Sequence, residues 1–277
     1  MAYAFSGVSA DEPGWAVLTE ATAAYRTAFG DRLVAACALG SLAHGGFAPT
    51  VSDVDLALVL DGRSPDDQAT IDRVRQNLCA RGGALHQRLS VFWSSLAALR
   101  ENRDDGRFPA IDRLDLAENV KILHGEDITA KLPRPDRAQL LKESARFALA
   151  KLATDRVVGA FHQPAMLLDA LVPLTRVVLL PVRFLHTTAT GRLAATDEAV
   201  DRYLADPQPV AAELIRTTMR WRHGDPVNTA RATALLNARL IPLYLHYIDS
   251  QLAELRKAGS DLAADFLAWR ERLDSSE

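Results

Sequence analysis

The chain has 277 residues, of which 48% are hydrophobic, enough for one large domain or two small ones with packed cores. Its 32 basic side chains nearly balance 35 acidic ones, for a net charge of −3. No broad attraction to the phosphates of long nucleic acids follows from this balance, which argues against a templated polymerase. The sequence also lacks a secretory leader pattern and any run of eighteen apolar residues, so it predicts a soluble, cytoplasmic protein with no membrane partner. The two cysteines, Cys37 and Cys79, are expected to be buried thiols rather than a disulfide or metal cluster.

Helix and strand patterns alternate over the first hundred residues. Apolar residues recur at helical spacing after Pro13 and stop at Gly30, which predicts an opening helix. Short apolar runs closed by glycine or Asp-Gly predict buried strands, and Gly82-Gly83 ends a helix that starts after Ser64-Pro65. The expected elements are a helix at 13–29, strands at 33–39 and 54–60, a helix at 64–80, a strand at 86–93 and a short helix at 94–100.

Two prolines within residues 131–135 mark the expected domain boundary, because proline interrupts regular structure. Before it, the polar segment 101–108 is expected to be a flexible surface insertion, and the amphipathic segment 111–123 a helix. This places a first domain at residues 1–130 and a second at 136–277.

Helical spacing is almost unbroken beyond the boundary. Pro173, Pro181 and Pro242 are expected to kink helices or to divide them. The fold class that follows is α+β: a small mixed β-sheet with helices on one side, followed by an all-α helical bundle. The expected helices of the bundle span 136–158, 164–186, 197–205, 209–222, 226–257 and 262–273.

The chemistry is concentrated between residues 39 and 56. Asp53 and Asp55 are two residues apart on a strand, so their side chains are expected on one face, about 6–7 Å apart along the backbone. Such a pair suits a magnesium ion that keeps part of its coordination shell for water and phosphate oxygens. Gly40 lets the backbone approach a phosphate closely, and the hydroxyl of Ser41 is able to donate a hydrogen bond to it.

Taken together, these residues resemble the signature of the nucleotidyltransferase superfamily with the DNA polymerase β-like fold. The resemblance covers roughly residues 10–100, and the helical second half is similar to that of small bacterial aminoglycoside and minimal nucleotidyltransferases. The motif consists of Leu39-Gly40-Ser41, eleven intervening residues, and Asp53-Val54-Asp55-Leu56.

The resemblance implies that Ser41 holds the β- and γ-phosphates of a nucleoside triphosphate while Asp53 and Asp55 ligate Mg²⁺. The implied reaction moves a nucleoside monophosphate from a magnesium-bound triphosphate, expected to be ATP, to a hydroxyl of a small molecule or a protein. The nucleotide is expected in a cleft between the two domains. The acceptor cannot be read from the sequence, and a homodimer is left open.

One departure from the family concerns a third carboxylate on the next strand, where this sequence has Ser90. Serine is a poor magnesium ligand and needs activation before it can act as a base. Glu143, early in the second domain, is the first candidate for a replacement acid. Further candidates are Asp112, Asp115 and Glu118, and each of the four is also interpretable as a surface charge on a helix.

Two basic residues complete the candidate site, each with an alternative. His44 follows the Gly-Ser turn closely enough to reach a phosphate, or it is a solvent-facing loop residue. Lys151 is placed to reach a triphosphate from the second domain, or it is a solvated charge. The alternative function, suggested by Ser90, is a catalytically impaired relative that acts as a nucleotide-binding regulator or an antitoxin-like partner.

Overall fold

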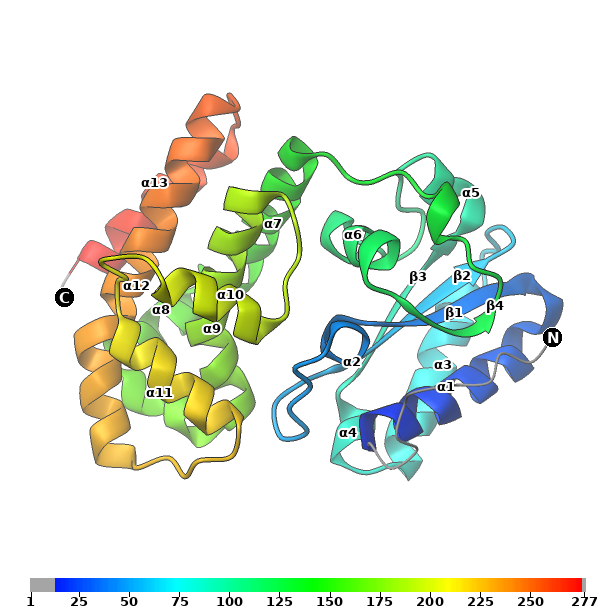
Figure 1. Cartoon of the computed structure of the whole chain (residues 1–277), viewed down its shortest axis with the longest axis horizontal. Helices are drawn as coiled ribbons and strands as arrows, with labels where there is room; N and C mark the ends of the chain where they lie inside the picture. The colour runs from blue at the N-terminus through cyan, green and yellow to red at the C-terminus, as the bar shows by residue number, and fades with distance from the viewer. Residues whose placement is uncertain (1–12, 276–277) are drawn as a thin grey trace. The chain divides into compact units, whose positions relative to one another are not determined.

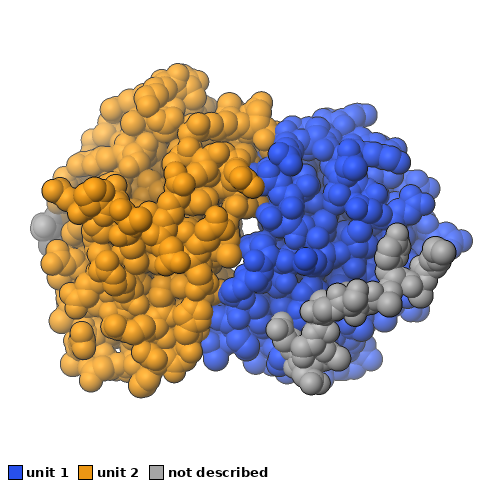
Figure 2. Space-filling model, in the orientation of Figure 1, with its two compact units in different colours: residues 1–134 blue, residues 135–277 orange. Residues whose placement is uncertain are grey.

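The structure, a computed structural model, describes residues 13–275. Its contacts separate into two compact units, residues 1–134 and residues 135–277 (Figure 2). The first unit contains a four-stranded mixed sheet with helices, and the second contains helices only (Figure 1). The α+β class expected from the sequence is therefore confirmed.

The first unit follows the expected order of elements through its first hundred residues. The additions are the short helical elements η1, α2 and α4. Because α4 comes before the third strand, that strand starts at residue 89 rather than 86. The elements are α1 (Pro13–Phe29), η1 (Gly30–Arg32), β1 (Leu33–Leu39), α2 (Gly40–His44), β2 (Val54–Leu60), α3 (Asp67–Arg81), α4 (Ala84–Gln87), β3 (Leu89–Ser95), α5 (Leu96–Arg100), α6 (Ala110–Glu118), β4 (Lys121–Gly125) and η2 (Thr129–Lys131).

The sheet has the strand order β3-β2-β1-β4, in which β1 is antiparallel to both of its neighbours and β2 is parallel to β3. Helices cover both faces, with α1 and α3 on one side and α5 and α6 on the other (Figure 1). The expectation of helices on one side only is wrong. The reason is that β2 is apolar on both faces: Leu56 and Leu58 join the core beneath α1, while Ala57 and Val59 pack with Leu99 and Leu116.

The sequence does not predict the fourth strand, β4, because the amphipathic pattern of residues 111–123 predicts one helix. The helix α6 ends at Glu118, where the backbone N–H of Asn119 still donates to the carbonyl of Asp115 at 2.9 Å. After Asn119 and Val120 the chain forms β4, residues 121–125, which pairs with β1 as an edge strand. An edge strand is half-exposed, so its residues do not show the continuous apolar run by which a central strand is recognised.

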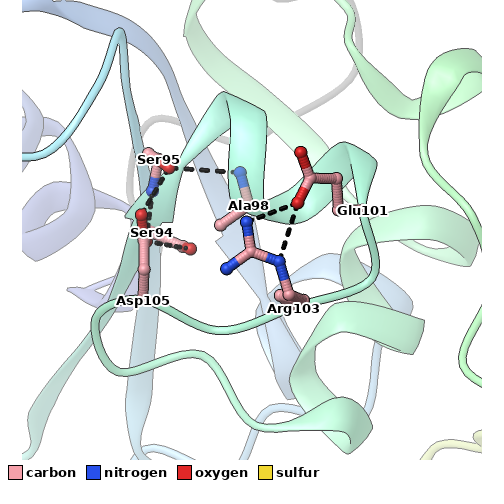
Figure 3. A network of polar contacts seen from close by, with 6 residues as sticks. All are labelled: Ser94, Ser95, Ala98, Glu101, Arg103 and Asp105. Carbon is pink, nitrogen blue, oxygen red and sulfur yellow. Dashed lines mark hydrogen bonds and ion pairs between the residues drawn. The ribbon is translucent and has the colours of Figure 1, made fainter.

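The segment 101–108 is tied to the end of β3 rather than being a loose insertion (Figure 3). The carboxylate of Asp105 accepts hydrogen bonds from the hydroxyl of Ser94 at 2.7 Å and from the backbone N–H and hydroxyl of Ser95 at 2.9 and 2.6 Å. Both serines are buried, so their donors require such an acceptor. Phe108 at the end of the segment is fully buried.

The second unit is a set of packed helices whose core contains Phe161, Tyr244, Tyr247 and Trp269. The helix expected over 136–158 is in fact two, because the chain restarts at a capping residue after Leu152. No helix among residues 13–275 has the length and apolar character needed to cross a bilayer. The elements are α7 (Arg137–Leu152), α8 (Asp155–His162), η3 (Pro164–Asp169), α9 (Leu171–Thr190), α10 (Thr196–Leu204), α11 (Ala212–Arg222), α12 (Thr229–Lys257) and α13 (Leu262–Asp274).

A capping residue explains the break between α7 and α8, and the prolines of the second unit do not break its helices. The hydroxyl of Thr154 accepts from the backbone N–H of Val157 at 3.4 Å, which is an N-cap contact that starts α8. Pro181 and Pro242 lie inside α9 and α12 without dividing either helix, and Pro173 lies in the first turn of α9, where a missing N–H costs nothing.

The cysteines differ in burial. Cys37 is buried in β1, and burial raises the pKa of its thiol to about 12. Cys79 is only half-buried, and its thiol donates to the carbonyl of His86 at 3.0 Å. Both thiols are free, so the expectation of buried thiols holds for Cys37 alone.

Candidate functional site

The two parts of the motif meet where β1 and β2 pair. Leu39, the last residue of β1, is the register partner of Asp55 on β2. The next residue, Gly40, has a φ of +62°, and a Cβ placed on it would lie 2.4 Å from Oδ2 of Asp55. A side chain at position 40 is therefore excluded both by the backbone conformation and by the carboxylate. The Gly40-Ser41 segment and the acid pair thus lie together at one end of the sheet.

The acid pair straddles the first residue of β2. Val54 and Leu56 are buried in the core beneath α1, so strand alternation places Asp55 on the opposite face, with Ala57. Asp53 lies immediately before the strand, two residues from Asp55, so the same alternation places it on the face of Asp55. Both acids are half-buried. This arrangement leaves carboxylate oxygens at the end of the sheet rather than inside it.

Arg88 holds the backbone on either side of Asp53. Its guanidinium donates to the carbonyl of Ser52 at 2.6 Å and also bonds to the carbonyl of Pro49. The carbonyl of Arg88 accepts from the backbone N–H of Val54 at 3.1 Å. One residue therefore fixes the chain before and after the first acid of the pair, a role that its place in the sequence does not reveal.

Asp115, from α6, reaches the start of α2. Its Oδ2 accepts a hydrogen bond from the backbone N–H of Gly40 at 2.7 Å and lies 3.6 Å from Nε2 of His44. Its Oδ1 accepts from the side-chain amide of Asn119 at 3.1 Å. Asp115 is one of the candidate acids in the sequence, and the structure brings it to the motif.

The Asp115 carboxylate is stable as an anion although only 5% of the residue is exposed. Burial by itself would raise its pKa, but the contacts with His44, the N–H of Gly40 and the amide of Asn119 together lower the pKa below its ordinary value. His44 is not a solvent-facing loop residue, since its side chain is only 14% exposed. Within residues 13–275 its buried Nδ1 has no hydrogen-bond partner.

Ser90 occupies the position beside Asp55 where the resemblance stated above implies a third carboxylate. The two residues are register partners in the parallel pairing of β2 and β3. The strand β3 contains no acidic residue, and Ser90 is half-buried. A carboxylate at this position would lie next to the acid pair, and its replacement by a hydroxyl removes one negative charge from the site.

The remaining candidates are engaged elsewhere or belong to the second unit. Glu118 pairs with Arg134 at 3.4 Å. Glu143 and Lys151 lie on α7, where Oε1 of Glu143 accepts from the side chain of Gln139 at 3.3 Å and Lys151 is exposed. The first unit therefore brings together Gly40, Ser41, His44, Asp53 and Asp55, whereas Glu143 and Lys151 come from the second unit.

The acid pair fits a nucleotide-bound magnesium ion better than an ion held by protein alone. Among residues 13–275, no group of three or more His, Cys, Asp or Glu side chains is arranged to hold a metal. Magnesium in nucleotide sites commonly takes one or two carboxylates and completes its shell with water and phosphate oxygens. Asp53 and Asp55 have the oxygen donors that the protein part of such a shell requires.

The second unit contains a cavity of about 490 Å³ between α9, α10 and α12. Its lining includes the acids Asp206 and Glu254 together with the bases Arg137 and Arg202. Since the two signs balance, the lining does not select a cationic ligand over an anionic one.

Comparison with known proteins supports the fold. No family model matches the chain, and no curated protein matches its sequence. A solved structure that is similar to this chain is the spectinomycin adenyltransferase AAD(9) from Enterococcus faecialis, crystallised with ATP and spectinomycin. The likeness has a TM-score of 0.53 at 15% identity and covers 82% of this chain and 98% of that one. This chain therefore has the fold of a nucleotidyltransferase of the DNA polymerase β-like type, joined to a helical unit.

Proposed function

We propose that this protein transfers a nucleoside monophosphate from a magnesium-bound nucleoside triphosphate, ATP, to a hydroxyl of a small molecule or a protein. The observation that carries the proposal is the contact between Gly40 and Asp55, which joins the phosphate-binding segment to the acid pair. The similar adenyltransferase was crystallised with ATP and spectinomycin, which supports a nucleotide and a small-molecule acceptor here.

Each residue of the first unit has a distinct part in this proposal. The segment Gly40-Ser41 lies against the β- and γ-phosphates, which Ser41 contacts through its hydroxyl. His44 approaches the same phosphates from the end of α2, where its Nε2 lies 3.6 Å from Oδ2 of Asp115. Asp53 and Asp55 hold Mg²⁺, which neutralises phosphate charge when bound.

The second unit contributes the other proposed groups. Glu143 accepts the proton of the acceptor hydroxyl, whose oxygen attacks the α-phosphorus; the bond from the α-phosphorus to the bridging oxygen breaks and pyrophosphate leaves. Lys151 contacts the triphosphate. In this proposal residues 1–130 form the nucleotidyltransferase domain and residues 136–277 form the domain that supplies these two side chains.

The test is transfer of label from ATP in the presence of magnesium, with spectinomycin, other aminoglycosides and purified proteins as acceptors. We expect labelled product with the wild type and a loss of about 100-fold or more in Asp53→Asn and Asp55→Asn, because each removes a charged metal ligand. Asp61→Asn is the matched control, since Asp61 is an exposed acid just beyond the other end of β2. A wild type that binds no magnesium nucleotide, or a loss as large in the control, would overturn the proposal.

The second candidate function is a nucleotide-binding regulator or antitoxin-like partner without catalysis. Ser90 favours it, because the register places a hydroxyl beside Asp55 where the family has a carboxylate. Nucleotide binding that depends on Asp53 and Asp55, without transfer to any acceptor, would support this function in place of the first.

A further inference from the structure

Asp115 is a buried carboxylate that lies on α6, the helix that packs on β1 over the face shared by Asp55 and Ala57. A charged group at 5% exposure is costly unless its oxygens are paired. Both oxygens of Asp115 are paired, and the partners lie in different places. The amide of Asn119, four residues along the chain, holds Oδ1, while Oδ2 is directed at the start of α2.

The residues that Oδ2 contacts are the two ends of α2. The N–H of Gly40 donates to it at 2.7 Å, and Nε2 of His44 lies 3.6 Å away. A helix of five residues contains little internal hydrogen bonding and does not hold its conformation alone. Gly40 also has a left-handed φ, and two more glycines with positive φ, Gly45 and Gly46, follow the helix. This short segment therefore depends on contacts from outside itself.

We propose that Asp115 is a positioning residue: its carboxylate holds α2 against Asp55 in the conformation that binds the magnesium nucleotide. The proposal rests on the function proposed above and deepens it. Asp115 acts through Gly40 and His44 and does not replace the carboxylate missing at Ser90, because its oxygens are already directed at N–H donors.

Asp67 offers a matched control for this role. It is also a buried carboxylate at 1% exposure, it also accepts from a backbone N–H, that of Ser64 at 2.6 Å, and it also pairs with a basic side chain, Arg32. The two carboxylates differ in place. Asp67 binds Arg32, which precedes β1, whereas Asp115 binds Gly40, which follows β1, so they contact opposite ends of the same strand. Substitution of either carboxylate is expected to lower the stability of the protein, whereas only substitution of Asp115 is expected to affect α2.

The experiment compares Asp115→Ala and Asp115→Asn with Asp67→Ala and Asp67→Asn in the full chain. Urea unfolding establishes that each variant is folded, and hydrogen exchange reports on the amide of Gly40 without any ligand. Titration calorimetry with ATP and magnesium gives the dissociation constant. If Asp115→Ala does not fold, Asp115→Asn carries the comparison, because its amide oxygen is able to accept from Gly40.

We expect the Gly40 amide to exchange about tenfold faster or more in Asp115→Ala, and the dissociation constant to rise about tenfold or more. Asp115→Asn should fall between this variant and the wild type. Both Asp67 variants should leave the exchange of Gly40 and the dissociation constant within about twofold. Equal weakening by both sets of variants, or unchanged exchange at Gly40 in the Asp115 variants, would overturn the proposal.

Failure of the wider function is separable from failure of this inference. A wild type that binds no magnesium nucleotide sinks the proposed function. The exchange of the Gly40 amide, measured without nucleotide, then decides alone whether Asp115 holds α2.

Discussion

Gly40 and Asp55 are in a contact that only glycine permits, since a Cβ on residue 40 would lie 2.4 Å from Oδ2 of the acid. The contact follows from the pairing of β1 with β2, which makes Leu39 and Asp55 register partners. Any change that pushes residue 40 away from the strand also moves it away from the acid pair. The geometry of the candidate site is therefore sensitive to a single methyl group.

Gly40→Ala should weaken magnesium nucleotide binding about tenfold or more and lower the free energy of unfolding by about 2–4 kcal/mol, from backbone strain and the displaced carboxylate. Calorimetric titration with ATP and magnesium and urea unfolding are the measurements. Gly30→Ala is the control, because Gly30 also has a positive φ, of +54°, but nothing lies within 4 Å of an added Cβ. It should show strain alone, about 1–2 kcal/mol, with nucleotide binding unchanged. Equal effects on binding from the two variants would contradict this account.

Arg88→Ala should release the backbone before Asp53, at Pro49 and Ser52, and raise the dissociation constant for the magnesium nucleotide about five- to tenfold, or ~1 kcal/mol. The reason is that the carbonyl of Ser52 loses its guanidinium donor. Arg81→Ala is the control, because the exposed Arg81 side chain bonds locally, to the carbonyl of Asn77 on the same helix, at 3.2 Å. Titration calorimetry again measures the change, and an unaltered affinity in Arg88→Ala would show that Asp53 does not need this support.

Ser90→Asp should restore a carboxylate next to Asp55 and increase the rate of label transfer about tenfold or more at saturating magnesium, since a third acid is able to act as ligand or base. Without magnesium the same variant should be less stable than the wild type, because three carboxylates repel one another. Ser90→Asn separates charge from size. Equal transfer rates in the Asp and Asn variants would mean that the serine does not limit the reaction.

Asp67→Asn should lower the free energy of unfolding by about 1–3 kcal/mol at neutral pH, because it breaks the two-pronged contact with Arg32 at 2.8 and 3.0 Å. Burial would raise the pKa of Asp67, but hydrogen bonds from Arg32 and from the N–H of Ser64 lower it below its ordinary 3.8. A depressed pKa in the folded state stabilises the protein above the unfolded value and ceases to do so as the pH falls through the folded value. The difference between wild type and variant should therefore shrink below about pH 4 in urea titrations; a difference that stays constant would contradict the assigned cause.

The sequence predicted those elements whose signal is local and continuous. The helix over residues 13–29 and the strands over 33–39 and 54–60 have the bounds expected from their apolar periodicity and their glycine ends. The strand β4 was missed because it lies at the edge of the sheet, where alternation is weak and the preceding helix hides its start. Helices on both faces were missed because a short buried strand does not reveal how many layers cover it.

The candidate site divides in the same way. The spacing of Gly40, Asp53 and Asp55 was visible in the sequence, since these residues lie at or beside the end of β1 and the start of β2, which follow each other along the chain. The hydrogen bond from Gly40 to Asp115 joins residues 75 positions apart, and no short pattern records such a pairing. In the sequence, Glu143 ranks first among the candidate acids because the resemblance implies a base from the second domain, and the spacing does not show which acid of α6 faces the motif.

By itself the sequence determined the α+β class, the Gly-Ser and Asp-x-Asp motif and the absence of an acid at residue 90, because each depends on the identity or periodicity of neighbouring residues. Only the tertiary structure decided that Asp55 contacts Gly40 and that the carboxylate of Asp115 accepts a hydrogen bond from the N–H of Gly40. It also decided that Arg88 bonds to the backbone next to Asp53. Those contacts arise from the register of the strands and from the packing of α6 on the sheet. Burial of apolar surface sets the register and the packing, and the apolar residues involved lie far along the chain from Gly40, Asp53 and Asp55.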